Sequence, residues 1–208
     1  SKKQCMFLEN TVNQKEQFGW IEVICGSMFS GKTEELIRRL KRAQFAKQKV
    51  EIFKPAIDRR YHDEMVVSHD ANEIRSTPVP AAANIRILAQ GCDVVGIDEA
   101  QFFDDEIITI CNDLANSGIR VIVAGLDMDF KGNPFGPMPA LMATAEYVTK
   151  VHAVCTRTGN LAHYSFRKSD DKKLVMLGET EEYEPLSRAA YYKAMREHHE
   201  DKNDEPKE

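Results

Sequence analysis

Glycines, a lysine and a hydroxyl residue fall within residues 26–33 at a spacing that is typical of phosphate binding. In order, the stretch consists of Gly26, Ser27, Met28, Phe29, Ser30, Gly31, Lys32 and Thr33. It matches the pattern G-x-x-x-x-G-K-[ST] at every fixed position. The glycines let the backbone turn tightly, so that successive N–H groups point at one phosphate. We therefore predict a nucleoside triphosphate site in which Lys32 bridges the β- and γ-phosphates and the Thr33 hydroxyl ligates Mg²⁺.

Two adjacent carboxylates, Asp98 and Glu99, follow a predicted strand at residues 93–97. In proteins with a phosphate-binding loop, an acidic residue at the end of such a strand holds Mg²⁺, directly or through water. We assign this role to Asp98. Glu99 can point elsewhere and is a candidate general base for deprotonating an attacking nucleophile. The alternative is an ordinary solvated acidic turn, which is less favoured in a chain that also carries a phosphate-binding loop.

The elements that must position these residues alternate between strand and helix. β-Branched apolar runs predict strands at residues 21–25, 50–53, 93–97, 120–124 and 147–155. Apolar residues at helical spacing predict helices at residues 33–47, 105–116 and 140–144. The polar stretch 56–76 predicts a long loop with room for a weak strand, and a Pro- and Ala-rich piece follows at 77–83. This alternation predicts an α/β fold of the P-loop, RecA-like kind, a mainly parallel sheet with helices on both faces.

After residue 155 the pattern changes from helical spacing to simple alternation. Residues 163–167 and 173–177 predict a two-stranded antiparallel hairpin with its turn at 168–172. A Tyr-Glu-Pro break at 183–185 precedes a predicted helix at residues 187–198. These elements predict a small C-terminal cap beside the nucleotide-binding core.

The chain therefore divides into four expected segments. They are an N-terminal arm at residues 1–19, a nucleotide-binding domain at 20–153, the cap at 154–198 and a tail at 199–208. The arm is polar with scattered apolar positions, and the tail is almost entirely charged from residue 200 onward. We expect the arm to be poorly ordered or loosely docked and the tail to be disordered.

The composition of the 208 residues narrows the function classes. The formal net charge is −5, which argues against a nucleic-acid partner because such proteins usually show a basic excess. The apolar stretches are too short to cross a bilayer, so no membrane partner is expected. The five cysteines form no C-x-x-C pair, which argues against a disulfide framework and indicates the reducing cytoplasm. With no N-K-x-D guanine motif either, phosphoryl transfer to a small molecule is the leading class.

Four short motifs together resemble one known family. They are Gly26 to Thr33, Asp98-Glu99-Ala100-Gln101-Phe102-Phe103, Gly125-Leu126-Asp127 with Phe130, and Pro134-Phe135-Gly136. The chain resembles the type II thymidine kinases, from residue 20 to about residue 193. The resemblance implies transfer of the γ-phosphate of ATP to the 5′-hydroxyl of thymidine in pyrimidine deoxynucleotide salvage, which supplies precursors for DNA synthesis.

The resemblance also implies roles for individual residues around the phosphates. Glu99 aligns with the catalytic base of the family, and Lys32 and Arg60 complete the expected catalytic set. The loop with Lys54, Asp58 and Arg60 is expected near the phosphates, where Arg60 acts as a cationic clamp. The expected ATP-binding residues are the eight of the loop at 26–33 together with Asp58, Asp98, Glu99, Ala100 and Gln101. The expected Mg²⁺ ligands are Thr33 and Asp98, and a solvated loop arginine is the alternative for Arg60.

The family pattern further implies a nucleoside pocket that is apolar with few polar anchors. Around the sugar and base it places Met28, Phe102, Leu126, Phe130 and Phe135. A plain core role remains the alternative, above all for Leu126. A lasso-like loop that closes over thymine is expected to contribute Val175, Met176, Leu177 and Gly178. Ser165 and Tyr183 are the side chains expected near the base.

One feature departs from the family pattern. Members of the family often carry a structural zinc ion in the cap, held by two C-x-x-C pairs. Here the corresponding positions are Cys155 with Thr158 and Ser187 with Ala190. Because three of four thiolates are absent and a structural zinc site needs four ligands, we predict no zinc. His152 and His163 are expected to be ordinary strand or surface residues.

Several alternatives stay open at this point. Another deoxynucleoside kinase that accepts deoxyuridine, a nucleotide-binding module without catalysis, and a P-loop ATPase acting on nucleic acid each fit part of the pattern. The intact set of Lys32, Thr33 and Glu99 argues against the second, and the acidic charge argues against the third. The resemblance also implies a homotetramer and feedback inhibition by thymidine triphosphate.

Overall fold

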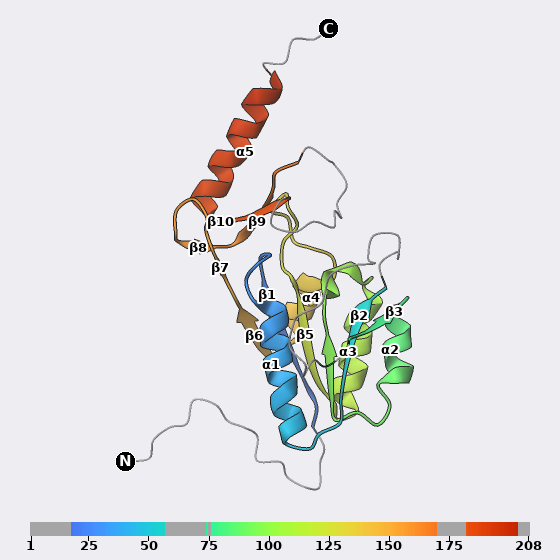
Figure 1. The fold of residues 1–208 in the computed structure, drawn as a ribbon. Helices are drawn as coiled ribbons and strands as arrows, with labels where there is room; N and C mark the ends of the chain where they lie inside the picture. The colour runs from blue at the N-terminus through green and yellow to red at the C-terminus, as the bar shows by residue number, and fades with distance from the viewer. Residues whose placement is uncertain (1–17, 57–73, 75, 170–181, 204–208) are drawn as a thin grey trace, which may run out of the picture.

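A six-stranded, fully parallel sheet forms the centre of the molecule in the computed structural model, which describes residues 18–56, 74, 76–169 and 182–203 (Figure 1). The strands are β1 (Trp20–Gly26), β2 (Val50–Pro55), β3 (Ser76–Val79), β4 (Val94–Ile97), β5 (Arg120–Leu126) and β6 (Tyr147–Lys150). Their order across the sheet is β3-β2-β4-β5-β1-β6. The predicted α/β class is confirmed.

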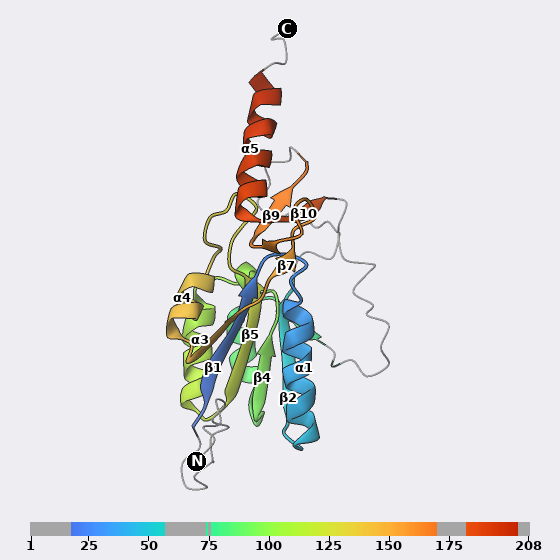
Figure 2. The same cartoon turned by 90° about the vertical axis from the view of Figure 1, so that its left-hand side faces the viewer.

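Helices cover both faces of this sheet (Figure 2). They are α1 (Lys32–Phe45), α2 (Ala82–Leu88), α3 (Glu106–Asn116) and α4 (Met138–Thr144), with a short 3₁₀ turn, η2, at Ala100–Phe102. α1 packs its buried Leu36 and Leu40 on one face, whereas α2, α3 and α4 share a second apolar cluster on the other. Because both faces are covered, the central strands β1, β4 and β5 are mainly apolar, as in other parallel sheets.

Glycine at position 96 of β4 lets α1 approach the sheet closely. A Cβ at Gly96 of β4 would lie 2.6 Å from Leu40 Cδ1, closer than two carbon atoms can pack. α1 therefore rests directly on β4 and β5. This packing matters for function because α1 starts at the end of the predicted phosphate-binding loop.

The cap is built from two short antiparallel pairs and a helix. β7 (Ala153–Val154) pairs with β8 (Leu161–Ala162), β9 (Tyr164–Arg167) pairs with β10 (Tyr183–Leu186), and α5 spans Arg188–Asn203. Tyr164 of β9 stacks on Tyr191 of α5 with ring centroids 4.3 Å apart. These rings anchor a separate apolar cluster that holds α5 against β9.

Two expectations for this part of the chain need correction. The strand opposite β9 is residues 183–186, where the sequence predicted a break at Tyr183-Glu184-Pro185. Pro185 is tolerated because this two-stranded sheet leaves an edge on which a missing N–H costs no ladder bond. The proposed partner strand at 173–177 lies outside the described residues. The strand predicted at 147–155 also divides into β6 and β7, because the chain leaves the sheet at residues 151–152.

The segment before β4 contains more structure than predicted. β3 extends the sheet at residues 76–79 and α2 follows at once, where only a Pro- and Ala-rich piece was expected. The Asn84 side chain accepts a hydrogen bond from the Ala81 N–H (3.1 Å) and so caps the start of α2. In the part of the chain that the structure describes, no helix is both long and apolar enough to cross a membrane.

Replacing Lys47 with Gly is expected to raise the free energy of unfolding by about 0.5–1 kcal/mol, as measured by urea denaturation. Lys47 follows the end of α1 with φ at +63°, a left-handed conformation that costs a residue with a Cβ roughly 1–2 kcal/mol. Glycine is the residue that usually occupies this position after a helix. The matched substitution Lys41→Gly, inside α1, should lower the free energy of unfolding by about 1 kcal/mol. A loss of stability in the Lys47→Gly protein would contradict the strain argument.

Candidate active site

The carboxyl ends of three neighbouring strands bring the predicted catalytic residues to one edge of the sheet. β1 leads into the loop at residues 26–33, β4 leads to Asp98 and Glu99, and β5 leads to Asp127. β5 lies between β4 and β1 in the sheet, and all three strands run parallel. Residues separated by about 70 positions in the sequence are therefore neighbours in space.

The loop at residues 26–33 adopts a conformation that needs its glycines. Gly31 has φ at +82°, and a Cβ at Gly26 would lie 2.2 Å from the Val151 carbonyl oxygen. Phe29 also has a positive φ, +61°, which is unfavourable for a residue with a Cβ. Ser30 Oγ donates a hydrogen bond to the Ser27 carbonyl (2.6 Å) and closes the loop. Such strain in a non-glycine residue is often found where a loop is shaped for a ligand.

The ammonium group of Lys32 lies inside this loop. Its Nζ donates a hydrogen bond to the Ser27 carbonyl oxygen at 2.7 Å. Burial lowers the pKa of Lys32, while the nearby carboxylates of Glu99, Asp98 and Asp127 act in the opposite direction. The lysine is thus held at the centre of the loop, beside the acidic groups that follow β4 and β5.

Thr33 and Asp98 face each other at the start of α1. Thr33 Oγ1 lies 3.0 Å and 3.3 Å from the two carboxylate oxygens of Asp98. Burial and the adjacent Glu99 raise the pKa of Asp98 to about 6. A hydroxyl and a carboxylate are the hard oxygen donors that Mg²⁺ prefers. The residues present therefore fit the expected metal.

Glu99 is held at the start of η2 by its backbone and by one neighbour. Its φ is +52° and its ψ is 39°, so this residue too is in the left-handed region. Gln101 Nε2 donates a hydrogen bond to Glu99 Oε2 at 2.5 Å. Ala100 is fully buried and Gln101 is 3% exposed. Neither side chain is exposed to solvent.

Two of the predicted pocket phenylalanines are in contact. The rings of Phe102 and Phe135 meet edge to face with centroids 5.7 Å apart. The Asp127 carbonyl accepts a hydrogen bond from the Phe135 N–H (3.1 Å), which folds residues 127–135 back over the end of β5. Leu126 is the last residue of β5 and is half-buried.

The cap contacts the loop at residues 26–33 directly. Ser165 Oγ accepts a hydrogen bond from the Met28 N–H at 2.9 Å, and Ser27 Oγ donates to the Ala162 carbonyl at 3.5 Å. Ser165 and Met28, both predicted for the nucleoside pocket, are thereby brought together. This contact joins the phosphate-binding loop to β9.

Arg167 is a residue of this site that the sequence analysis missed. Its guanidinium carbon lies 3.7 Å from the ring centroid of Phe130, and its Nη2 donates a hydrogen bond to the Tyr183 hydroxyl at 2.8 Å. It is buried, and it lies two residues after Ser165 on the same face of β9. The alternation of that strand was the signal that could have identified it.

Asp127 was noted as part of a motif without a role. Its buried carboxylate pairs with Lys150 Nζ at 2.8 Å, at the ends of the strands on either side of β1. Asp127 also contributes to the electrostatic environment of Lys32. The acidic groups that follow β4 and β5 thus lie on the same side of β1, the strand that leads into the phosphate-binding loop.

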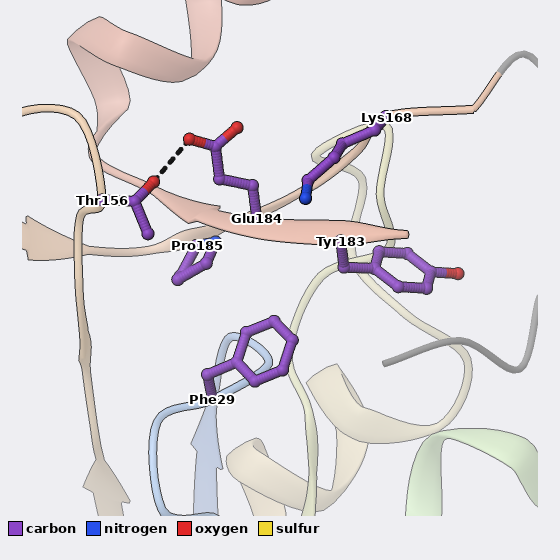
Figure 3. A pocket seen from close by; sticks show the side chains of 6 residues that line it. All are labelled: Phe29, Thr156, Lys168, Tyr183, Glu184 and Pro185. Atoms are coloured by element: carbon purple, nitrogen blue, oxygen red, sulfur yellow. Dashed lines mark hydrogen bonds between the residues drawn. The ribbon is translucent and has the colours of Figure 1, made fainter. Parts of the chain in front are cut away.

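A cavity of about 480 Å³ opens between the tip of this loop and the cap (Figure 3). Phe29 points toward β10 from below, and Pro185 and Tyr183 lie on the strand above it (Figure 3). Thr156, Glu184 and Lys168 complete the lining. Thr156 Oγ1 donates a hydrogen bond to Glu184 at 2.5 Å, which links this wall to the β7–β8 turn.

The positions that correspond to the zinc-binding cysteines also lie together. Thr158 and Ser187 hydroxyls are 3.3 Å apart, and Cys155 and Ala190 are buried in the same apolar cluster. Burial alone would raise the pKa of the Cys155 thiol, but hydrogen bonds from Thr158 and Ser187 outweigh it and lower the pKa to about 6. One thiol, two hydroxyls and a methyl group do not fit the sulfur and nitrogen ligands that structural zinc requires.

Some predicted site residues lie outside the described residues. These are Asp58, Arg60, Val175, Met176, Leu177 and Gly178. Lys54, predicted in the same loop as Asp58 and Arg60, lies near the end of β2 and is half-buried. The roles assigned to these residues therefore rest on the resemblance alone.

The fold and the site define a P-loop protein that binds a nucleoside triphosphate. A family model for thymidine kinase matches residues 19–191, and the chain belongs to the thymidine kinase family, as predicted. A thymidine kinase of Bacteroides thetaiotaomicron is 62% identical over 92% of this chain and 96% of its own length. Thymidine kinases of Porphyromonas gingivalis and a Rhodothermus species are each 60% identical, over 89% and 83% of this chain and 91% and 81% of theirs.

Proposed function

We propose that this protein transfers the γ-phosphate of ATP to the 5′-hydroxyl of thymidine and releases thymidine monophosphate and ADP. The identity of about 60% to named thymidine kinases over most of the chain supports this activity. The observation that carries the proposal is the meeting of Lys32, Thr33, Asp98 and Glu99 at one edge of the sheet. Beside them lies the apolar contact between Phe102 and Phe135.

The phosphate chain of ATP is held by the loop at residues 26–33. Its backbone N–H groups and the start of α1 bind the phosphates. Lys32 exchanges its hydrogen bond to the Ser27 carbonyl for the β- and γ-phosphate oxygens. Thr33 and Asp98 would hold Mg²⁺, which would neutralise charge on the phosphates.

Glu99 acts on the thymidine hydroxyl. It removes the proton of the 5′-hydroxyl as the bond between O5′ and the γ-phosphorus forms. The bond from that phosphorus to the bridging oxygen breaks, and its electron pair leaves with ADP. Arg60, which follows β2 in the sequence, stabilises charge on the transferred group.

The nucleoside is bound between the end of β5 and the cap. Met28, Phe102, Leu126, Phe130 and Phe135 surround the sugar and base. Ser165 and Tyr183 lie near the base, and the loop with Val175, Met176, Leu177 and Gly178 pairs the polar edge of thymine. An unpaired polar group there would cost about 1–3 kcal/mol, enough to distinguish thymine from cytosine.

An assay of purified protein with ATP, Mg²⁺ and separate nucleosides tests this function. Thymidine should give thymidine monophosphate, whereas deoxycytidine and the purine deoxynucleosides should react at least tenfold more slowly, as one lost hydrogen bond implies. Equal rates with thymidine and deoxyuridine would favour a broader deoxynucleoside kinase. Absence of product with every nucleoside would favour a binding module without catalysis.

We further propose that the protein acts in the cytoplasm as a homotetramer and is inhibited by thymidine triphosphate. The resemblance supports the assembly and the inhibition, and the unpaired cysteine pattern supports the compartment. Light scattering of the purified protein tests the homotetramer, and assays with added thymidine triphosphate test the inhibition. A monomer, or full activity at saturating thymidine triphosphate, would contradict them.

Metal analysis of the purified protein is expected to find less than a tenth of an equivalent of zinc per chain. The residues at the four corresponding positions offer a single thiolate, and structural zinc sites use four ligands. Incubation with a strong zinc chelator should therefore leave the thermal midpoint unchanged. One equivalent of bound zinc would contradict this prediction.

A further inference from the structure

The side chain of Gln101 joins the candidate catalytic base to the end of β5. Its Nε2 donates a hydrogen bond to Glu99 Oε2 at 2.5 Å, and its Oε1 accepts one from the Leu126 N–H at 3.0 Å. The residue is only 3% exposed. A buried amide that spans a carboxylate and a backbone N–H has both of its ends satisfied.

The direction of the amide is fixed by its partners. The Leu126 N–H can only donate, so the amide oxygen must face it. The amide nitrogen then faces Glu99, whose carboxylate can accept. A carboxylate that accepts this bond has one oxygen held and the other available to take a proton.

The surroundings leave Gln101 little freedom to move. A Cβ at Gly125 would lie 3.0 Å from Gln101 Oε1 and 2.6 Å from Met138 Sδ. A Cβ at Gly136 would lie 2.7 Å from the backbone carbonyl oxygen of Gln101. Glycine at position 125 therefore permits the close contact with the amide, and glycine at position 136 permits the close contact with the backbone of the same residue.

These contacts argue against direct binding of nucleotide by Gln101. The side chain is buried, and both ends of its amide are already bonded. Glu99, by contrast, has a left-handed backbone and, among the described residues, one side-chain hydrogen-bond partner, Gln101. The glutamine is thus the group that sets the direction of the carboxylate.

We infer that Gln101 is a positioning residue that orients the Glu99 carboxylate relative to the nucleoside pocket, a role that rests on the proposed function. Through the Leu126 N–H, it fixes the distance between the base and the strand that ends at the pocket wall. The Glu99 carboxylate and the 5′-hydroxyl of the nucleoside are thereby held at a fixed position relative to each other. Misplacement of a catalytic group by about 1 Å can cost roughly 10²-fold in rate.

The Gln101→Glu variant tests this role at unchanged side-chain length. The new side chain keeps an oxygen for the Leu126 N–H, but it replaces the amide donor with a second carboxyl group against Glu99, which alters both the position and the protonation of the base. Gln101→Met introduces no charge and therefore separates the two effects. We expect kcat of the Gln101→Glu enzyme to fall roughly 100-fold, while KM for thymidine and the Kd for ATP change less than about threefold. Gln101→Met removes both hydrogen bonds, so its kcat should fall as much and its thermal midpoint should fall by roughly 3–8 °C as well. Gln90→Glu, an equal charge change at an exposed turn, is the matched control and should behave as the wild type.

A double-mutant cycle with Glu99→Gln shows whether Gln101 acts through the base. If it does, Gln101→Met should lower kcat less than about threefold once Glu99 is already replaced. The inference would be overturned if the fold-losses in kcat of the two single variants multiplied in the double variant. A Gln101→Glu enzyme with kcat within threefold of the wild type would overturn it as well. A wild-type protein that phosphorylates no nucleoside would instead overturn the proposed function, so the two failures are distinguishable.

Discussion

Replacing Glu99 with Gln is expected to lower kcat for thymidine phosphorylation roughly 10³-fold, because a general base typically contributes 10²–10⁴-fold. The amide has the shape of the carboxylate but cannot take the proton of the 5′-hydroxyl. The Kd for ATP should change less than about threefold, because Lys32 and the backbone of residues 26–33 bind the phosphates. Steady-state kinetics and nucleotide titration measure the two effects separately.

Glu106→Gln provides the matched control for this change. Glu106 is exposed in the first turn of α3, and its substitution removes the same charge from the same part of the chain. It should leave kcat unaltered. A near-normal kcat for the Glu99→Gln enzyme would mean that another group deprotonates the hydroxyl.

The second large effect is expected for Lys32→Met. Methionine fills a similar space but cannot neutralise charge on the β- and γ-phosphates. kcat should fall roughly 10²–10³-fold, in the range found when one transition-state donor is removed. The Kd for ATP should rise at least about tenfold, because charge-assisted hydrogen bonds to phosphate are lost.

Lys41→Met, further along α1, is the control for Lys32→Met. It lies outside the phosphate-binding loop and should retain wild-type values of both kcat and Kd. An unchanged Kd for ATP in the Lys32→Met protein would contradict the phosphate role of this lysine. A change in Kd with unchanged kcat would restrict that role to ground-state binding.

The parts of this fold that the sequence predicted are those set by local patterns. The runs at 21–25 and 120–124 are mainly apolar because both faces of a parallel strand are buried, and both became central strands. The loop at 26–33 could be predicted because its tight turn requires glycines at fixed positions in the sequence. Asp98 and Glu99 were found because they come directly after a strand.

The parts that were missed depend on contacts between distant residues. β10 contains a proline and gives no local strand signal, but pairing with β9 extends it. α2 is seven residues long, too short for its periodicity to be distinctive. The contacts of Arg167 with Phe130 and of Gln101 with Leu126 join residues 37 and 25 positions apart, and no spacing rule connects them.

The pairing of β1 has a consequence for synthesis of the protein. Both sheet neighbours of β1 come late in the chain: Trp20 pairs with Arg120, and Cys25 pairs with Lys150. The strand that supports the phosphate-binding loop therefore has no partner until about three fifths of the polypeptide has left the ribosome, and it has both partners only at about three quarters. Nascent chains that end before residue 120 should not be retained on immobilised ATP, whereas released full-length protein should be.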